Sequence, residues 1–100
     1  MREITCTAVL NADASAQLID VREANELHTG MVAAAAHLPM SELTARLGEL
    51  DPSRRVIAVC RSGARSASVA EALTAAGFEC DTMGGGMIEW SAQGFPVRFL

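Results

Sequence analysis

The stretch from residue 56 to residue 77 constrains the fold of this chain more than any other. It begins with the apolar run 56–59, passes through a short polar loop that contains Gly63, and then carries a helical pattern over residues 64–76. Small apolar residues recur at helical spacing in that pattern, and Gly77 is a typical helix stop. A buried strand that leads through a tight loop into a helix is the repeating unit of parallel sheets in α/β proteins.

The rest of the chain repeats this alternation over short connections. Strand candidates lie at 2–6, 17–21, 33–38 and 78–83, and helix candidates lie at 7–14, 23–28, 42–50 and in a short segment that ends at Trp90. Ser41 is the expected cap of the helix at 42–50. The order predicts an α/β domain with a mainly parallel sheet, in which ligands bind at the carboxyl ends of the strands.

Length and composition exclude several classes of protein. One hundred residues suit one domain, over 1–100, and the net charge of −4 without a basic block disfavours a nucleic acid or a membrane as partner. The three cysteines have neither CxxC nor Cys/His spacing, so we expect no disulfide framework, no metal and no cofactor. No signal-peptide core and no apolar stretch of ~20 residues is present, and a reactive thiol favours a reducing, cytoplasmic setting.

Cys60 is the strongest candidate for a reactive group. It lies where the strand at 56–59 ends, so its sulfur faces backbone N–H groups and the positive end of a helix dipole. Such surroundings, with arginines nearby, lower a thiol pKa from ~8.5 to ~4–7. Arg61 and Arg65 flank the loop glycine. We therefore predict a thiolate nucleophile; the alternative is a small buried hydrophobic residue at a strand end.

Four stretches in this order resemble a single-domain rhodanese, a sulfurtransferase. They are LIDVRE at 18–23, the region 30–39, CRSGARS at 60–66 and GGMIEW at 85–90. The resemblance implies a three-layer, rhodanese-like fold in which a mainly parallel five-stranded sheet is flanked by helices on both faces. One stretch departs from the family pattern: GMVAAA stands at 30–35 where GHIPGA is usual, which alters the local loop path.

The resemblance also implies a mechanism. Cys60 is the expected catalytic residue: it attacks the outer sulfur of a donor such as thiosulfate, displaces sulfite and becomes a persulfide, from which cyanide, a thiol or a protein acceptor takes the sulfur. Loop amides cradle the sulfur and loop arginines bind the donor. This assigns substrate binding to Arg61, Ser62, Gly63, Ala64, Arg65 and Ser66.

Several of these residues have plainer interpretations. Arg65 could pair with a carboxylate at the helix start, Arg61 could be a solvated charge, and Ser62 and Ser66 could cap the helix. Asp20 and Arg22 are supporting residues, for which we favour a structural role over a place on the pocket rim.

Two other functions compete with sulfur transfer. The first is a cysteine phosphatase or arsenate reductase, because the rhodanese fold resembles that of cell-cycle dual-specificity phosphatases. Those phosphatases carry Arg six positions after the cysteine, whereas in this chain the sixth position is Ser66 and Arg65 is fifth. By the same resemblance, the shorter loop is expected to fit one sulfur atom better than a phosphate. A persulfide relay or binding module with little small-molecule turnover needs the same Cys60 loop, so the sequence does not separate it from an enzyme.

Overall fold

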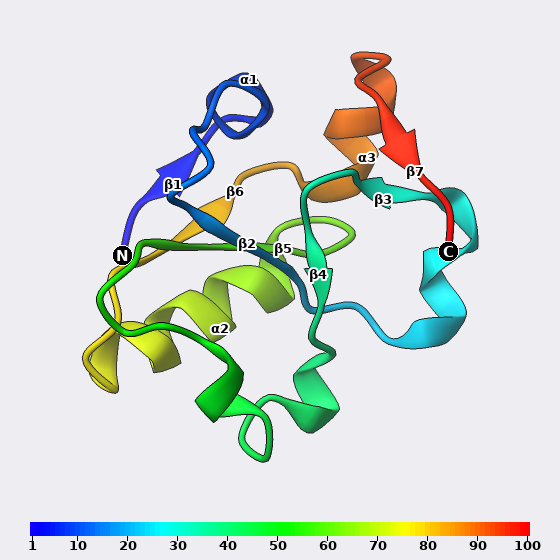
Figure 1. Cartoon of the computed structure of the whole chain (residues 1–100). Helices are drawn as coiled ribbons and strands as arrows, with labels where there is room; N and C mark the ends of the chain where they lie inside the picture. The colour runs from blue at the N-terminus through cyan, green and yellow to red at the C-terminus, as the bar shows by residue number, and fades with distance from the viewer.

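In the computed structural model, which describes residues 1–100, five parallel strands form the central sheet (Figure 1). Their spatial order is β1 (Glu3–Ile4), β6 (Cys80–Met83), β5 (Val56–Val59), β2 (Gln17–Asp20) and β4 (Ala36–His37). All four residues of β5 are buried, as a central parallel strand requires. The mainly parallel five-stranded sheet is therefore confirmed.

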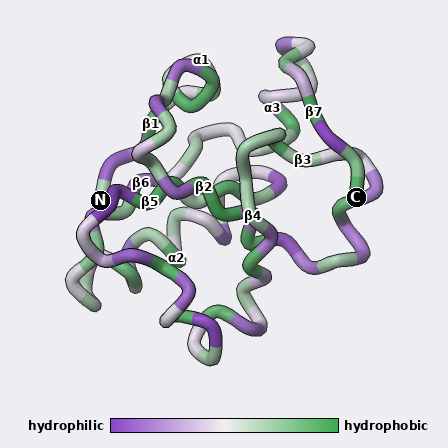
Figure 2. The backbone as a smooth tube through the Cα atoms, in the orientation of Figure 1, coloured by the Kyte–Doolittle hydropathy of each residue, from purple (hydrophilic) through white to green (hydrophobic).

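Helices cover both faces of the sheet because side chains alternate along β5. Ile57 and Val59 face a hydrophobic cluster that includes residues of α1 (Cys6–Leu10) and α3 (Gly86–Ala92). Val56 and Ala58 face a second cluster, which α2 (Ala64–Ala75) covers. Figure 1 shows α2 on one side of the sheet and α1 and α3 on the other, and in Figure 2 hydrophobic colour predominates around β5. The three-layer arrangement is thus confirmed.

The prediction of a helix at 42–50 was wrong. That region contains two short 3₁₀ turns, η2 (Met40–Glu42) and η3 (Leu47–Glu49). Gly48 falls inside the predicted helix, where glycine costs ~1 kcal/mol relative to alanine. The apolar face was nevertheless assigned correctly, because Leu43, Leu47 and Leu50 pack in or against the cluster under α2.

The strand predicted at 33–38 is shorter than expected, since β4 has only two residues. A second, antiparallel sheet was not predicted: β3 (Met31–Val32) pairs with β7 (Val97–Arg98) near the end of the chain. The Arg98 guanidinium donates to the carbonyls of Ala33 at 2.8 Å and Ala35 at 2.6 Å, which fixes the turn between β3 and β4.

The segment predicted as a helix at 23–28 is the 3₁₀ helix η1 (Ala24–Thr29), and it ends at Gly30 as expected. The first strand, the first helix and the strand before residue 84 all occur with shorter bounds than predicted. None of the helices combines the length and apolarity needed to cross a membrane.

Candidate active site

The carboxyl ends of the central strands bring the predicted site residues to one edge of the sheet. Cys60 directly follows β5, and Asp20 is the last residue of β2, the parallel neighbour of β5. Asp20 lies opposite Val59 in the register of these strands. This is the edge at which α/β sheets bind ligands.

The sulfur of Cys60 accepts hydrogen bonds from the loop backbone. The Gly63 N–H lies 3.1 Å from Sγ, and the Ser66 N–H lies 3.4 Å from it. Gly63 has φ of 99°, a left-handed conformation that favours glycine, and α2 starts at the next residue. Cys60 is fully buried, as the plainer interpretation expects, but its sulfur also faces two amides, which that interpretation does not require.

These contacts shift the acidity of the thiol. Burial raises the pKa of Cys60, but hydrogen bonds from the Ser66 side chain and from the amides of Ser66, Gly63 and Ser62 outweigh it, so the pKa falls below its ordinary value. The other cysteines behave oppositely. Burial raises the pKa of Cys6, and burial together with the Asp81 charge raises that of Cys80 to about 12. Cys60 is therefore the thiol most readily ionised.

Ser66 anchors the first turn of α2 beneath the sulfur. Its hydroxyl donates to the Gly63 carbonyl at 3.2 Å and shares a 2.7 Å hydrogen bond with the Thr82 hydroxyl on β6. Ser66 and Thr82 are both buried, so the contact ties the helix start to the sheet. Ala64, by contrast, is exposed and makes no hydrogen bond to Sγ.

The start of α3 fixes the other side of the thiol loop. The Met87 N–H donates to the Cys60 carbonyl at 2.9 Å, and the Ile88 N–H donates to the Arg61 carbonyl at 3.0 Å. Gly86 makes this approach possible: a Cβ there would lie 2.4 Å from the Arg61 oxygen. The glycines at 84–86 thus allow the close approach of the α3 start to the thiol loop.

Arg65 and Arg61 have different surroundings. The Arg65 guanidinium makes two hydrogen bonds, of 2.7 and 2.6 Å, to the carboxylate of Glu26 in η1, so the carboxylate-pairing interpretation describes its position. This contact lowers the pKa of Glu26 to about 2 and, with a smaller contribution from the Cys60 thiolate, raises that of Arg65. Arg61 is exposed, and its side chain has no hydrogen-bond or ion-pair partner.

Asp20 and Arg22 form a buried ion pair. The Arg22 guanidinium makes three hydrogen bonds of 2.8–3.1 Å to the Asp20 carboxylate. It also donates to the carbonyls of Glu26 and Gly30 and to the Thr29 hydroxyl. Arg22 is only 2% exposed, and its guanidinium ties β2 to η1 beside the thiol loop.

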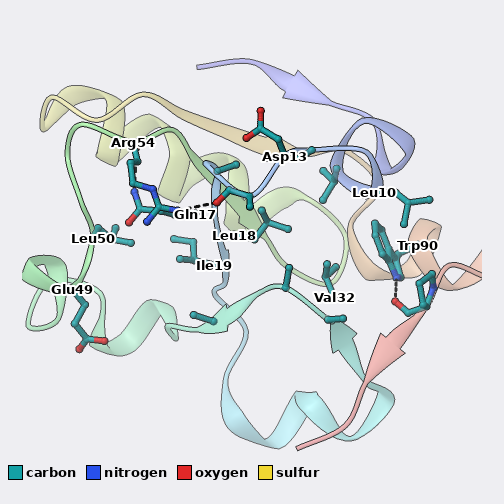
Figure 3. A pocket seen from close by; sticks show the side chains of 18 residues that line it. Leu10, Asp13, Gln17, Leu18, Ile19, Val32, Glu49, Leu50, Arg54 and Trp90 are labelled. Carbon is teal, nitrogen blue, oxygen red and sulfur yellow. Dashed lines mark hydrogen bonds between the residues drawn. The ribbon is translucent and has the colours of Figure 1, made fainter.

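A large cavity lies away from the thiol. This groove of about 640 Å³ runs along the β2–β4 side of the sheet, between Leu10, Trp90 and Leu50 (Figure 3). Its lining is mostly apolar and includes Gln17 at the amino end of β2. Residues 60–66 contribute nothing to it, so it does not belong to the Cys60 site.

Comparison with known proteins agrees with this geometry. The sequence profile of the Rhodanese-like domain matches residues 7–93, which include the whole thiol loop. This chain belongs to the rhodanese family. Among relatives of this rhodanese, YtwF of Bacillus subtilis, provisionally named a sulfurtransferase, is 34% identical, over 96% of both chains. A protein of Allochromatium vinosum named sulfurtransferase is 36% identical, over 80% of this chain and 76% of its own.

Solved structures also show that this chain has the rhodanese fold. A rhodanese-related protein from Thermoplasma volcanium superposes with a TM-score of 0.91 at 30% identity, and the match covers 98% of each chain. The family and the three-layer fold are therefore shown along nearly the whole chain, together with a sulfurtransferase-like role at the level of the family.

Two features of this rhodanese site were missed from the sequence. Glu26 lies three residues after Glu23, a spacing typical of a capping box, and its carboxylate does accept the Glu23 N–H at 2.9 Å. Nothing local signals its pairing with Arg65, which is 39 residues away. The second feature is the pair of hydrogen bonds from the Met87 and Ile88 amides to the carbonyls of Cys60 and Arg61. The glycines that precede Met87 are the only feature of the sequence that could have indicated them.

Proposed function

We propose that this chain is a sulfurtransferase that moves a sulfane sulfur from a thiosulfate-like donor to a thiophilic acceptor through a persulfide on Cys60. The observation that supports it best is the sulfur of Cys60, held by two loop amides with its pKa lowered at the carboxyl edge of the sheet. The thiolate is the nucleophilic form of cysteine, so sulfur transfer requires that Cys60 be ionised at neutral pH.

In the first step, the Cys60 thiolate attacks the outer sulfur of thiosulfate. A new S–S bond forms, the S–S bond of thiosulfate breaks, and its electron pair leaves with sulfite. The product is an anionic persulfide with the same charge as the thiolate that it replaces. The amides of Gly63 and Ser66 are positioned to stabilise either anion.

In the second step, an acceptor attacks the outer sulfur of the persulfide. Cyanide leaves as thiocyanate, and a thiolate leaves as a new persulfide; in both cases the electron pair of the broken S–S bond returns to Cys60. No metal or redox partner enters either step. A sulfur carrier protein could serve as acceptor in the same way, through its own thiolate.

The arginines of the loop support the first step in different ways. Arg61 is exposed and free to bind an anionic donor as it approaches. Arg65 is held by Glu26, so it contributes positive potential near the sulfur from a fixed position.

Mass spectrometry tests this proposal directly. Incubation with thiosulfate should add the mass of one sulfur atom to the peptide that contains Cys60, and cyanide or dithiothreitol should remove it. Cys60→Ser should abolish both the adduct and thiosulfate:cyanide turnover, whereas the matched variant Cys80→Ser should retain them. An adduct on Cys6 or Cys80, or turnover by Cys60→Ser, would refute the assignment.

Kinetics then separate the two arginines. Arg61→Ala should raise the KM for thiosulfate roughly tenfold, the effect of losing about 1.4 kcal/mol of anion binding. Arg65→Ala should lower kcat more than it raises KM, because its partner Glu26 would then bring an uncompensated negative charge near the sulfur. Equal profiles for the two variants would contradict this division.

A further inference from the structure

Two buried hydroxyl groups meet beneath the thiol loop, where α2 packs on β6. The Ser66 hydroxyl, on the first turn of α2, lies 2.7 Å from the hydroxyl of Thr82, the third residue of β6. Thr82 is 1% exposed and Ser66 is fully buried. A buried hydroxyl costs free energy unless it is hydrogen-bonded, so each of the two protons needs an acceptor.

The neighbours of the two hydroxyls fix the direction of this hydrogen bond. Besides Thr82, the Ser66 hydroxyl is close to the Gly63 carbonyl, at 3.2 Å, which can only accept. The Thr82 hydroxyl has no hydrogen-bond partner other than Ser66. If Ser66 donated to Thr82, the Thr82 proton would be left without an acceptor. Both groups are satisfied when Thr82 donates to Ser66 and Ser66 donates onward.

The carbonyl that receives the Ser66 proton does not depend on it. The Ala67 N–H also donates to the Gly63 carbonyl, at 3.1 Å, at the start of α2. Rotation of the Ser66 hydroxyl away from this carbonyl therefore leaves no backbone group without a partner. The hydroxyl proton is free to turn to a stronger acceptor nearby.

The sulfur of Cys60 becomes that acceptor when it is ionised. The Ser66 N–H already lies 3.4 Å from Sγ. Burial raises the pKa of Cys60, and the Ser66 side chain makes the largest of the hydrogen-bond contributions that lower it. A charged acceptor forms a stronger hydrogen bond than a neutral carbonyl. A hydroxyl that itself accepts a hydrogen bond is also a better donor, because chains of hydrogen bonds polarise one another.

From this geometry we propose that Thr82 is a positioning residue, whose hydroxyl donates to Ser66 so that the Ser66 hydroxyl donates to the anionic sulfur of Cys60. The inference rests on the proposed function, because the Cys60 thiolate is the group that attacks the donor. Thr82 touches neither the sulfur nor a substrate. It occupies the Ser66 oxygen as an acceptor and thereby directs the single Ser66 proton to the thiol loop.

The variants that test this proposal change no charge around the site. Charged side chains lie on the loop and on each element near it: Arg61, Arg65, Glu26, Asp20, Arg22, Glu89, and Asp81 with its partners Arg2 and Arg55. Replacing Thr82 by Val or Ser leaves all of them in place. A change in the ionisation of Cys60 would therefore be due to the hydroxyl group.

The test measures the ionisation of Cys60 through its rate of alkylation. Iodoacetamide reacts with the thiolate, so the rate for the Cys60 peptide, followed by mass spectrometry across pH, has its midpoint at the thiol pKa. Thr82→Val keeps the shape of the side chain and removes the hydroxyl. We expect its midpoint to rise by about 0.5 pH unit, which leaves roughly threefold less thiolate on the acid side of the profile. Ser66→Ala, which removes the donor itself, should raise the midpoint by about 1 pH unit.

A double variant shows whether Thr82 acts through Ser66. Adding Thr82→Val to Ser66→Ala should raise the midpoint no further, because the hydroxyl between Thr82 and the sulfur is already gone. Thr82→Ser is the matched control: it keeps the hydroxyl and loses a buried methyl group, so its midpoint should stay that of the unmodified protein although its stability falls. A contact that only ties α2 to β6 would change the stability of these variants and move no midpoint.

Three results would overturn the proposal: an unmoved midpoint in Thr82→Val, a rise in Thr82→Ser as large as in Thr82→Val, or additive rises in the double variant. Thr82→Ala also lacks the hydroxyl and should shift the midpoint as Thr82→Val does, so the result does not depend on how valine packs.

The first half-reaction gives a second readout. The rate of persulfide formation from thiosulfate should be roughly threefold lower in Thr82→Val on the acid side of the profile and equal to that of the unmodified protein at alkaline pH. Equal rates at every pH would count against Thr82. Failure of the unmodified protein to form any persulfide would overturn the proposed function, whereas the alkylation midpoints would still decide the role of Thr82.

Discussion

Replacing Glu26 by Gln tests how the partly exposed ion pair with Arg65 supports the site. Glu26→Gln keeps the shape of the side chain and removes its charge. The pKa of Glu26 is lowered from 4.5 to about 2, chiefly by the Arg65 hydrogen bonds. At about 1.36 kcal/mol per pKa unit, a ceiling of ~3 kcal/mol follows. The side chains are 27% and 37% exposed, so solvent screens the pair, and we expect a loss of about 1–1.5 kcal/mol in the free energy of unfolding.

The pH dependence gives this prediction its sign. Because the folded-state pKa of Glu26 lies below the unfolded value, the ion pair stabilises the fold fully above pH 4.5. The contribution decreases as the pH falls towards about 2, where the carboxylate protonates in the folded state as well. The difference between the unmodified protein and Glu26→Gln should therefore be largest at pH 7, smaller at pH 3.5 and close to zero once the pH falls below about 2.

Urea unfolding measures this difference, with the fluorescence of Trp90, the single and buried tryptophan, as the probe. Glu71→Gln is the matched control, because Glu71 is exposed and has no ion pair. Its effect should be within a few tenths of a kcal/mol of zero at every pH. Equal stabilities for Glu26→Gln and Glu71→Gln at pH 7, or a difference that persists undiminished at low pH, would refute the reasoning.

Three other outcomes are expected. Asp20→Asn should lower the free energy of unfolding by about 3–5 kcal/mol in urea, because it leaves a buried arginine unpaired; a loss below 1 kcal/mol would contradict that account. Gly86→Ala should cost at least ~2 kcal/mol, whereas Gly94→Ala, also at positive φ but in open space, should cost less. Iodoacetamide at neutral pH should modify Cys60 before Cys80, because only the Cys60 pKa is lowered; peptide mass mapping would show the reverse order if this is wrong.

The parts of the fold that the sequence predicts well are those encoded by contiguous residues. The strand before Cys60, the loop and α2 follow one another, so apolar runs, one glycine and helical spacing are enough to locate them. The candidate site is also encoded by contiguous residues, because the two amides that contact the Cys60 sulfur belong to residues 63 and 66. Their roles in sulfur transfer stay predictions.

The errors arise where distant segments decide the local structure. Ser41 has the residue type of a helix cap, but its hydroxyl donates to Glu23 at 2.6 Å, 18 residues earlier. Ser41 lies inside the 3₁₀ turn η2, so it caps no α-helix, and only the apolar face of the segment 42–50 follows the predicted pattern. The pairing of β3 with β7 and that of Glu26 with Arg65 likewise join residues far apart, for which short patterns carry no signal.

The contact between Gly86 and the carbonyl groups of residues 60 and 61 has a consequence for redesign of this scaffold. With the nearest backbone oxygen only 2.4 Å from where a methyl group would stand, α3 packs directly against the turn that follows Cys60. A residue inserted between Cys60 and α2, in order to admit a tetrahedral oxyanion, has no room on the side of α3 and would have to extend the loop on its exposed side, where Arg61 and Ser62 lie. Redesign for a larger anion would therefore change the exposed part of the turn and keep its contact with α3.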